Sequence, residues 1–291
     1  YNSDSITKTG YIMINAPPTV DLGDDTTTIC QGDSVLLDAG AGHTNYLWST
    51  GDTTQTIYAS SSGNYSVTVG NGTEVNNSNS LSFDGQDDYI NFLSLLDSAE
   101  FSIGLSILSH NQYGQIFYNG QGDSQVYGNY GLLIDILSTG ELYTSMSTNL
   151  AAENYTGSKV LNDTLWYNVY ITFDNGELKY YIDGQLDLNT NTIGNHLIIN
   201  SVNTSKLGIG VNSSYPFSGN LDNFQVWNIS LSQSEIQNYM SCPPTGNEAG
   251  LVGYWNFNEG SGNTVTDLTS NGNNGTINGA SWSTQIPNQY C

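Results

Sequence analysis

The chain has 291 residues, enough for two domains, and it carries 27 acidic residues against 4 lysines and no arginine, a net charge of −23. A chain this acidic is excluded as a partner of nucleic acids or anionic membranes, because a phosphate surface needs a basic face. No apolar run reaches the length of a membrane span, no signal peptide is recognisable, and the first letters begin in mid-pattern, as expected of a fragment of a longer protein.

The pattern of short strands and linkers predicts three parts. Residues 1–16 are expected to be the last strand of a preceding module, ending at the letters APP. Residues 17–76 are expected to form a small domain of short strands, with Trp48 in its core. The polar stretch 71–79 is expected to link this domain to a larger β-sandwich over residues 77–291.

Most segments of the larger part alternate apolar and polar residues with a period of two and are interrupted by Gly, Asn or Asp, which is typical of strands in hairpins. The stretch FDNGELKYYIDG carries Asp-Asn-Gly at its tip, a strong hairpin signal. Only residues 230–241 are expected to be helical, because Ser232 and Glu235 have the spacing of a capping box. The expected class is all-β, built of β-sandwiches.

The three cysteines leave two interpretations open. If Cys242 and Cys291 pair, they close a loop of about 50 residues and stabilise the fold by about 4 kcal/mol. Cys30 is then left over as a free, buried thiol, and the compartment is oxidising. The alternative is three free thiols in a reducing compartment.

Three stretches of the small domain, ICQGDSVLLDAG, YLWSTGDTTQTI and SGNYSVTV, resemble the immunoglobulin-like modules of secreted Bacteroidetes proteins. Such modules usually end with a second cysteine, which would pair with Cys30, but the corresponding letters VTVGNGTEV contain none. The N-terminal letters TKTGYIMIN are similar to the last strand of a PKD-type module.

Three blocks of the larger part, SLSFDGQDDYINF, LWYNVYITFDNGELKYYIDGQ and FSGNLDNFQVWNISLSQSEI, resemble laminin-G-like, concanavalin-type jelly rolls and occur in the family's order. The resemblance implies a jelly roll over residues 77–291. In many members a segment like LVGYWNFNEGSG comes before the LSFDG strand, whereas here it follows the helix. Since a jelly roll brings its first and last strands side by side, we expect residues 251–283 to close the sandwich. The alternative is that they begin a second repeat.

Oxygen-rich turns predict a structural Ca²⁺ ion, because calcium takes about six to eight oxygen ligands from carboxylates, amides and carbonyls. The C-terminal loop offers Asp267, Asn271 and Asn273. The family resemblance adds Asp222, since the late strand and this loop lie together in related jelly rolls. The alternative is that these side chains only satisfy the turns.

A second, weaker calcium candidate is the acidic turn DGQDDY, which holds Asp84, Asp87 and Asp88. Three carboxylates within five residues repel one another unless a cation or water separates them. The alternative for this cluster is a solvated turn.

A glycan-binding face is the third candidate, because the chain has 20 tyrosines and exposed aromatic rings stack on sugars. The richest stretch lies at residues 109–131 and contains Tyr113, Tyr118, Tyr127 and Tyr130. The alternative is that many tyrosines are core and the others ordinary surface. Trp166 and Trp227 lie inside predicted strands and are expected in the core.

No catalytic residue is predicted. Glycosidases place two carboxylates about 5–9 Å apart, often in an E-x-D-x-x-E strand pattern that this chain lacks. Glu141, Glu153 and Glu177 are isolated in the sequence, and the histidines have no metal-ligand spacing. We therefore expect a protein that is not an enzyme.

Several short triplets that begin with Asp-Ser or Asp-Thr resemble the O-glycosylation signal of secreted Bacteroidetes proteins. The hydroxyls concerned belong to Ser5, Thr26, Ser34, Thr53, Ser98 and Thr164.

Together these features predict an extracellular, calcium-supported adhesion module within a long modular surface or secreted protein. Its expected partners are glycans or cell-surface proteins, besides the neighbouring modules of the same chain. Two alternatives stay open. One is a structural spacer or filament subunit without a small ligand, and the other is a carbohydrate-binding accessory of a polysaccharide-degrading enzyme.

Overall fold

The fold is taken from a computed structural model, which describes residues 22, 28–30, 32–41, 43, 45–70, 76–93, 95–96, 99–110, 113–120, 131–161, 164–192, 194–197, 204–209 and 215–289. The chain divides into two compact units, residues 1–74 with 290–291 and residues 75–289. The strand predicted at residues 1–16 lies outside the described residues.

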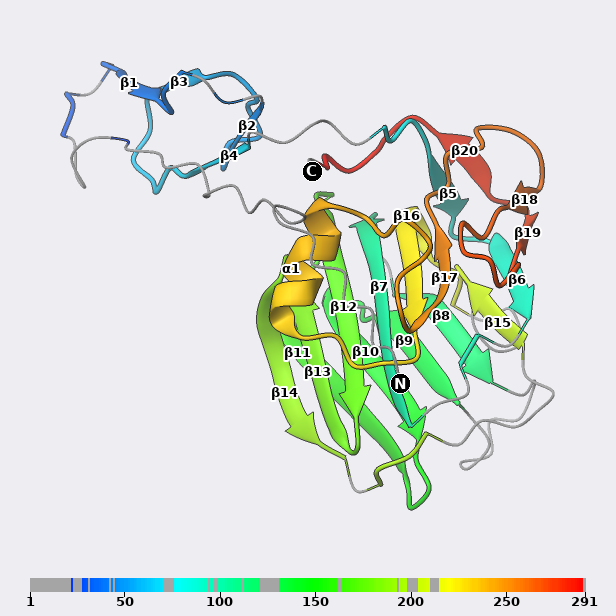
Figure 1. Cartoon of the computed structure of the whole chain (residues 1–291). Coiled ribbons are helices and arrows are strands. Elements are labelled where there is room, and N and C mark those ends of the chain that lie inside the picture. The colour runs from blue at the N-terminus through cyan, green and yellow to red at the C-terminus, as the bar shows by residue number, and fades with distance from the viewer. Residues whose placement is uncertain are drawn as a thin grey trace, which may run out of the picture. The chain divides into compact units, whose positions relative to one another are not determined.

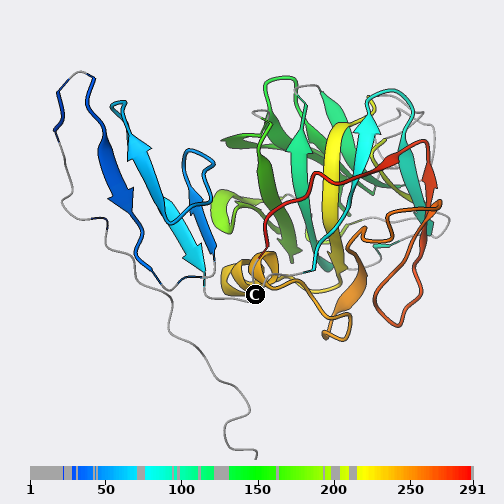
Figure 2. The same cartoon turned by 90° about the horizontal axis from the view of Figure 1, so that it is seen from above.

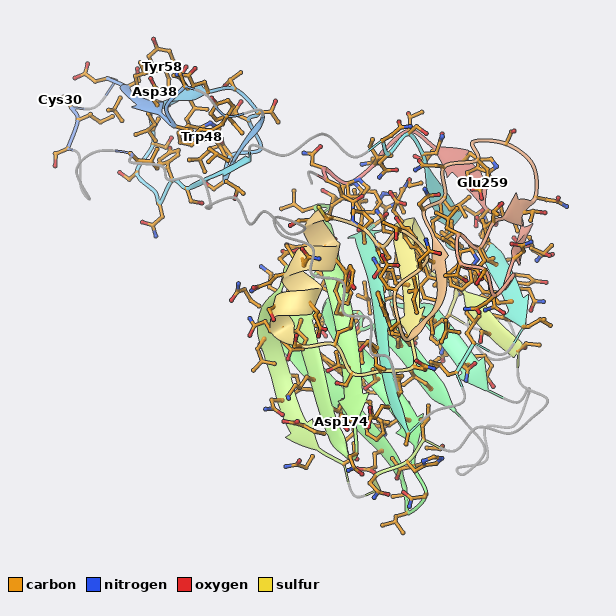
Figure 3. The ribbon with its side chains drawn as sticks, in the orientation of Figure 1. Cys30, Asp38, Trp48, Tyr58, Asp174 and Glu259 are labelled. Atoms are coloured by element: carbon orange, nitrogen blue, oxygen red, sulfur yellow. The ribbon has the colours of Figure 1, made fainter. Side chains whose placement is uncertain are left out.

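The described residues of the N-terminal unit form four short strands in two antiparallel pairs (Figure 1). The pairs are β1 (Val35–Asp38) with β3 (Thr56–Ala59), and β2 (Asn45–Trp48) with β4 (Val67–Gly70). Trp48 lies in the core of this unit as expected, 2% exposed, and its ring nitrogen donates to the Thr54 carbonyl at 2.7 Å (Figure 3). Cys30 is free but exposed, so the expectation that it is buried was wrong. The immunoglobulin-like assignment of this unit stays a prediction.

The larger unit consists of two antiparallel sheets that pack face to face (Figures 1 and 2). The β8 sheet has the strand order β11 (Ala152–Val160), β10 (Glu141–Ser147), β9 (Leu132–Ile136), β8 (Gly114–Gly120), β15 (Thr204–Leu207), β6 (Tyr89–Leu93), β19 (Gly275–Asn278) and β18 (Thr264–Val265). The β7 sheet has the order β14 (Gln185–Asn191), β13 (Glu177–Ile182), β12 (Trp166–Asp174), β7 (Glu100–Ser109), β16 (Ser218–Trp227), β5 (Ser80–Asp84) and β20 (Ser281–Ser283), and β17 (Leu251–Trp255) also pairs with β16.

The main core lies between these two sheets. Every second residue of a strand faces it, as in Leu132, Ile134 and Ile136 of β9, because side chains alternate across a sheet. Trp227 is fully buried as expected, although not in this core, and Trp166 is only partly buried. The all-β prediction is confirmed.

The predicted helix is confirmed as α1 (Gln233–Ser241), and Ser232 and Glu235 form the expected capping box. The helix covers the outer face of the β7 sheet, where Ile236 packs in a second apolar cluster with Tyr170 and Trp227. Among the described residues no helix is long and apolar enough for a membrane crossing.

The C-terminal segment adds strands to both sheets. β17 pairs with β16 and β20 pairs with β5 in the β7 sheet, while β19 pairs with β6 in the β8 sheet. Trp255, Val265 and Ile277 from this segment are buried in the main core. Residues 251–283 are therefore part of this sandwich in both layers.

The predicted hairpin tip is confirmed between β12 and β13. Asn175 and Gly176 have φ angles of 51° and 97°, the positive values that a tight two-residue hairpin turn requires. Asp174, just before this turn, is exposed (Figure 3).

Candidate functional site

A row of polar side chains crosses the outer face of the β8 sheet. Gln115 of β8 is the register partner of Asp135 of β9, and Asp135 is that of Tyr143 of β10. The neighbours Ile134 and Ile136 face the main core, so the period of two places Asp135 on the opposite face. Helix α1 packs on the β7 sheet. The polar row therefore lies on a sheet face that this helix does not cover.

Asp135 and Gln115 are buried although they are polar. Asp135 is 0% exposed, and its Oδ2 accepts a hydrogen bond from the Tyr113 hydroxyl at 3.0 Å. Within the described part of the chain, its other oxygen, Oδ1, has no hydrogen-bond partner, and neither has Oε1 of Gln115. Buried acceptors without partners are rare in folded proteins, and such atoms call for an explanation.

Two tyrosine rings meet beside this carboxylate and form a corner. The centroids of Tyr113 and Tyr215 lie 4.6 Å apart, and their planes meet at 88°. Tyr113 is partly buried, while Tyr215 is 56% exposed. We call Tyr113, Gln115, Asp135 and Tyr215 the aromatic corner.

The backbone holds Tyr215 in an uncommon conformation. Its φ angle is 56°, in the left-handed region that large side chains rarely adopt, and its carbonyl accepts from the Gln115 backbone N–H at 2.8 Å. A strained residue that keeps a large ring in solvent is a feature that recurs at binding sites.

Burial controls the protonation of this site. Burial raises the pKa of Asp135 to about 7, and its contacts with Tyr113 and Gln115 act in the opposite direction. The pKa of Tyr113 is raised as well, first by burial and then by the nearby charge of Asp135. Asp135 is therefore partly ionised at neutral pH, and the Tyr113 hydroxyl keeps its proton.

Of the four tyrosines predicted to bind glycans, the structure places Tyr113 in the aromatic corner. Tyr118 lies in β8 and is only 3% exposed, so its ring face is not open for stacking. Tyr127 and Tyr130 lie outside the described residues.

Sequence reasoning missed Asp135, Gln115 and Tyr215. A signal for Asp135 was available, because a single carboxylate interrupts the apolar strand LLIDI. Tyr215 carried no such signal, since its position depends on a contact between segments about a hundred residues apart.

The C-terminal loop brings Asp267, Asn271 and Asn273 together but uses their polar groups within the protein. The two oxygens of Asp267 accept four hydrogen bonds, from Tyr254 N, Thr269 N, Thr269 Oγ1 and Asn273 N. The side-chain amides of Asn271 and Asn273 both donate to the Val252 carbonyl. These contacts stabilise the loop, and the predicted calcium ion at this loop stays a prediction.

Asp222 of β16 lies in a different buried polar cluster. Its oxygens accept from Asn77 Nδ2 and from the Asn223 backbone N–H, both at 2.7 Å. Burial raises the pKa of Asp222 to about 8. No described contact joins Asp222 to Asp267.

The acidic turn between β5 and β6 does bring carboxylates together. Carboxylate oxygens of Asp84, Asp87 and Asp88 lie within 4.8 Å of one another, and this is the one such group of metal-ligand side chains in the described part of the chain. Burial raises the pKa of Asp88, and the charges of Asp84 and Asp87 act in the same direction. Within the turn, both oxygens of Asp84 accept hydrogen bonds from Gln86, and Asp88 Oδ2 accepts from the Asp84 N–H.

The remaining predicted sites concern modification and cysteine pairing. Ser34, Thr53 and Thr164 are exposed, while the other predicted glycosylation sites, Ser5, Thr26 and Ser98, lie outside the described residues. Cys242 follows α1 as its C-cap residue, and Cys291 lies outside the described residues, so their pairing stays a prediction.

Two of the carboxylates that the sequence left isolated, Glu153 and Glu177, have contacts in the structure. Glu177 forms an ion pair with Lys179 at 2.8 Å. Glu153 is buried and accepts from the Thr148 hydroxyl at 3.1 Å.

The chain matches known proteins in sequence and fold. Residues 84–237 match the family model described as the concanavalin A-like lectin/glucanases superfamily. Among solved structures, a candidate carbohydrate-binding protein from Bacteroides ovatus is 18% identical with a TM-score of 0.58, and the match covers 90% of this chain and 72% of that one. This likeness concerns the fold.

Two further structures are similar over a smaller part of this chain. A heptameric SAP-like pentraxin from Limulus polyphemus is 17% identical with a TM-score of 0.48, over 57% of this chain and 83% of that one. The CBM40 module of a sialidase from Ruminococcus gnavus is 17% identical with a TM-score of 0.43, over 57% of this chain and 94% of that one.

Proposed function

The chain belongs to the concanavalin A-like lectin/glucanases superfamily, and from this premise we propose that it is a non-catalytic, extracellular glycan-binding module that serves adhesion. The aromatic corner is the proposed binding site. The observation that carries the proposal is the exposed Tyr215 ring, which stands at right angles to Tyr113 beside two buried acceptors without partners among the described residues.

The residues of the aromatic corner have the chemistry that binds a sugar. The apolar face of a pyranose packs on an aromatic ring, while its hydroxyls donate to carboxylate and amide oxygens. Tyr215 offers an exposed ring, so the proposed contact is made by this ring, while the acceptor oxygens of Asp135 and Gln115 are buried. The likeness in fold to the candidate carbohydrate-binding protein from Bacteroides ovatus supports the proposal by analogy.

A glycan array with purified protein tests this function. We expect binding to at least one glycan class, and we expect Tyr215→Ala to reduce it at least about tenfold, which corresponds to about 1.4 kcal/mol. Tyr58→Ala is the matched control, because Tyr58 is 73% exposed but lies on β3 of the N-terminal unit (Figure 3). Absence of all binding would favour a structural spacer, and equal binding by both variants would reject the aromatic corner as the binding site.

The proposal includes a structural Ca²⁺ ion. The acidic turn suits the ion better than the C-terminal loop does, because three carboxylates converge there. In both places carboxylate oxygens already accept hydrogen bonds, those of Asp84 and Asp88 in the turn and those of Asp267 in the loop. Calorimetric titration with calcium is expected to show binding that Asp87→Asn weakens and Asp174→Asn leaves unchanged. If chelator abolishes glycan binding, calcium supports adhesion, and if binding survives, the ion has a structural role only.

A further inference from the structure

The chain enters the larger unit through residues 76–79, a part of the predicted linker that belongs to this unit. We call these residues the entry segment. Asn258, which follows β17, binds it through both side-chain atoms. Its Oδ1 accepts from the Ser78 N–H at 2.7 Å, the Ser78 hydroxyl at 3.2 Å and the Asn79 N–H at 3.0 Å. Its Nδ2 donates to the Asn76 carbonyl at 3.2 Å, so one side chain binds three residues of the entry segment.

The late strand β16 and the C-terminal end of the unit hold the same part of the chain. Asn77 Nδ2 donates at 2.7 Å to Oδ2 of Asp222, which is 0% exposed. Ser80, the buried first residue of β5, donates from its hydroxyl to the Gln285 carbonyl at 2.7 Å. The same hydroxyl accepts from Asn220 Nδ2 at 3.1 Å. The start of the larger unit is therefore tied to residues that are far away in the sequence.

The turn that carries Asn258 is shaped for this contact. Phe257 has a φ angle of 47°, in the left-handed region that large side chains rarely adopt, and its ring is fully buried in the main core. This buried ring fixes the direction in which the next side chain points. Gly260 packs closely against the entry segment, because an added Cβ would lie 3.0 Å from Asn79 Nδ2. Strain of this kind is kept where the surroundings determine it and is a feature of functional positions.

The first and last strands of the unit would otherwise resist tension poorly. Ser80 of β5 and Ser283 of β20 are register partners in an antiparallel pair, so the chain enters β5 and leaves β20 at the same end of that pair. Tension between the two ends of the unit therefore separates the pair from this end, and its ladder hydrogen bonds break one after another. The hydrogen bonds of the entry segment come before the ladder along the chain, so they receive the load first.

We propose that the entry segment and Asn258 form a clamp that carries tension arriving from the N-terminal side and keeps β5 paired with β20 and β16. The ends of a domain fray easily unless they are tied down, and the clamp ties down the end through which tension enters. This inference goes beyond the proposed function and does not depend on glycan binding, so an empty glycan array leaves it unchanged.

Single-molecule pulling of the full chain from its two ends tests the clamp. Reductant keeps Cys242 and Cys291 unpaired, so that the load passes through β20. At constant tension we expect the larger unit to open at least about tenfold faster in Asn258→Ala, which removes the acceptor of three hydrogen bonds. Asn263→Ala is the matched control, because Asn263 is an exposed asparagine of the same C-terminal segment. Equal opening rates in Asn258→Ala and the wild type would overturn the inference.

Two further measurements separate a clamp from a general loss of stability. Asn258→Asp keeps the accepting oxygens and is expected to open nearly as slowly as the wild type, and a failure of this rescue would refute the role of the acceptor. A tag inserted at the exposed β12–β13 turn allows pulling between this turn and the C-terminal end, which does not load the entry segment. Asn258→Ala is expected to have no effect in this geometry, and equal acceleration in both geometries would overturn the clamp.

Hydrogen exchange of the wild-type chain needs no variant. Ser78 is exposed, but its N–H and that of Asn79 both donate to Asn258 Oδ1. We expect both amides to exchange at least about tenfold more slowly than free amides, because the clamp has to open first. Exchange of these amides at the rate of an unprotected chain would show that the clamp is not formed in solution.

Discussion

Two buried carboxyls are the residues whose environment departs most from that of a solvated acid. Asp135 and Asp222 are both 0% exposed, and burial raises their pKa values to about 7 and about 8. Each retains a proton in the folded chain that the unfolded chain loses near pH 4. Between about pH 4 and the pKa values of the folded chain, the folded state therefore binds more protons than the unfolded state. Its free energy of unfolding falls as the pH rises through this range.

The pH dependence of stability should report Asp222. The free energy of unfolding is expected to fall as the pH rises from about 4 to about 8, and Asp222→Asn is expected to make this fall smaller. Denaturant titrations at several pH values check the prediction, with Asp174→Asn as an exposed control. If the free energy of unfolding changes with pH equally in Asp222→Asn and in the wild type, Asp222 is not the group that titrates.

Asp267 is expected to matter for stability, because its side chain accepts four hydrogen bonds inside the C-terminal loop. Asp267→Ala leaves those donors without partners, and the expected loss is about 3 kcal/mol of unfolding free energy. Thermal denaturation measures the loss with and without calcium. A loss that appears only in the presence of calcium would assign Asp267 to an ion instead of to the loop.

At the scale of elements, α1 depends on local contacts at its start and on packing along one side. The Ser232 hydroxyl accepts from the Glu235 N–H, and the Glu235 carboxylate accepts from the Ser232 N–H at 2.8 Å. Ile236 is buried against the β7 sheet. The cap defines where the helix begins, and the buried face holds it on the sheet.

Removing the cap should cost a modest amount of stability. Ser232→Ala is expected to lower the unfolding free energy by about 1 kcal/mol, because helical N–H groups lose an acceptor. Asn238→Ala, an exposed position of the same helix, is the control and is expected to change little. Urea titration of both variants distinguishes the cap from a general effect of the helix, and equal losses would argue against the capping contribution.

At the scale of the whole molecule, the larger unit depends on strands from both ends of its sequence. β5 and β6 near its start pair with β20 and β19 near its end. β17 pairs with the C-terminal part of β16. Without these C-terminal strands, both sheets would expose unpaired edges and a part of the main core.

Ending the chain at Pro243 tests this dependence. The shortened protein lacks Trp255, Val265 and Ile277 of the main core and is expected to aggregate or to lose cooperative unfolding. Size-exclusion chromatography and circular dichroism report the outcome. A stable, monomeric product would show that residues 251–283 are dispensable for this sandwich.

The sequence by itself determined the features that depend on near neighbours. Alternating residues predicted the strands, Asn175 and Gly176 predicted the hairpin turn, and Ser232 with Glu235 predicted the start of the helix. Each of these signals works through contacts within a few residues, so a linear pattern records it.

Only the tertiary structure decided which polar and aromatic residues come together and which are buried. Tyr113 contacts both Asp135 of β9 and Tyr215, residues that are far from it in the sequence, and Tyr118, in the same predicted stretch as Tyr113, is buried instead. Likewise, the sequence predicted an ion near Asp267, which stays a prediction, and only the fold showed the four hydrogen-bond donors around its carboxylate. Burial and the choice of hydrogen-bond partner depend on residues far away in the chain, and these decide the chemistry of a side chain.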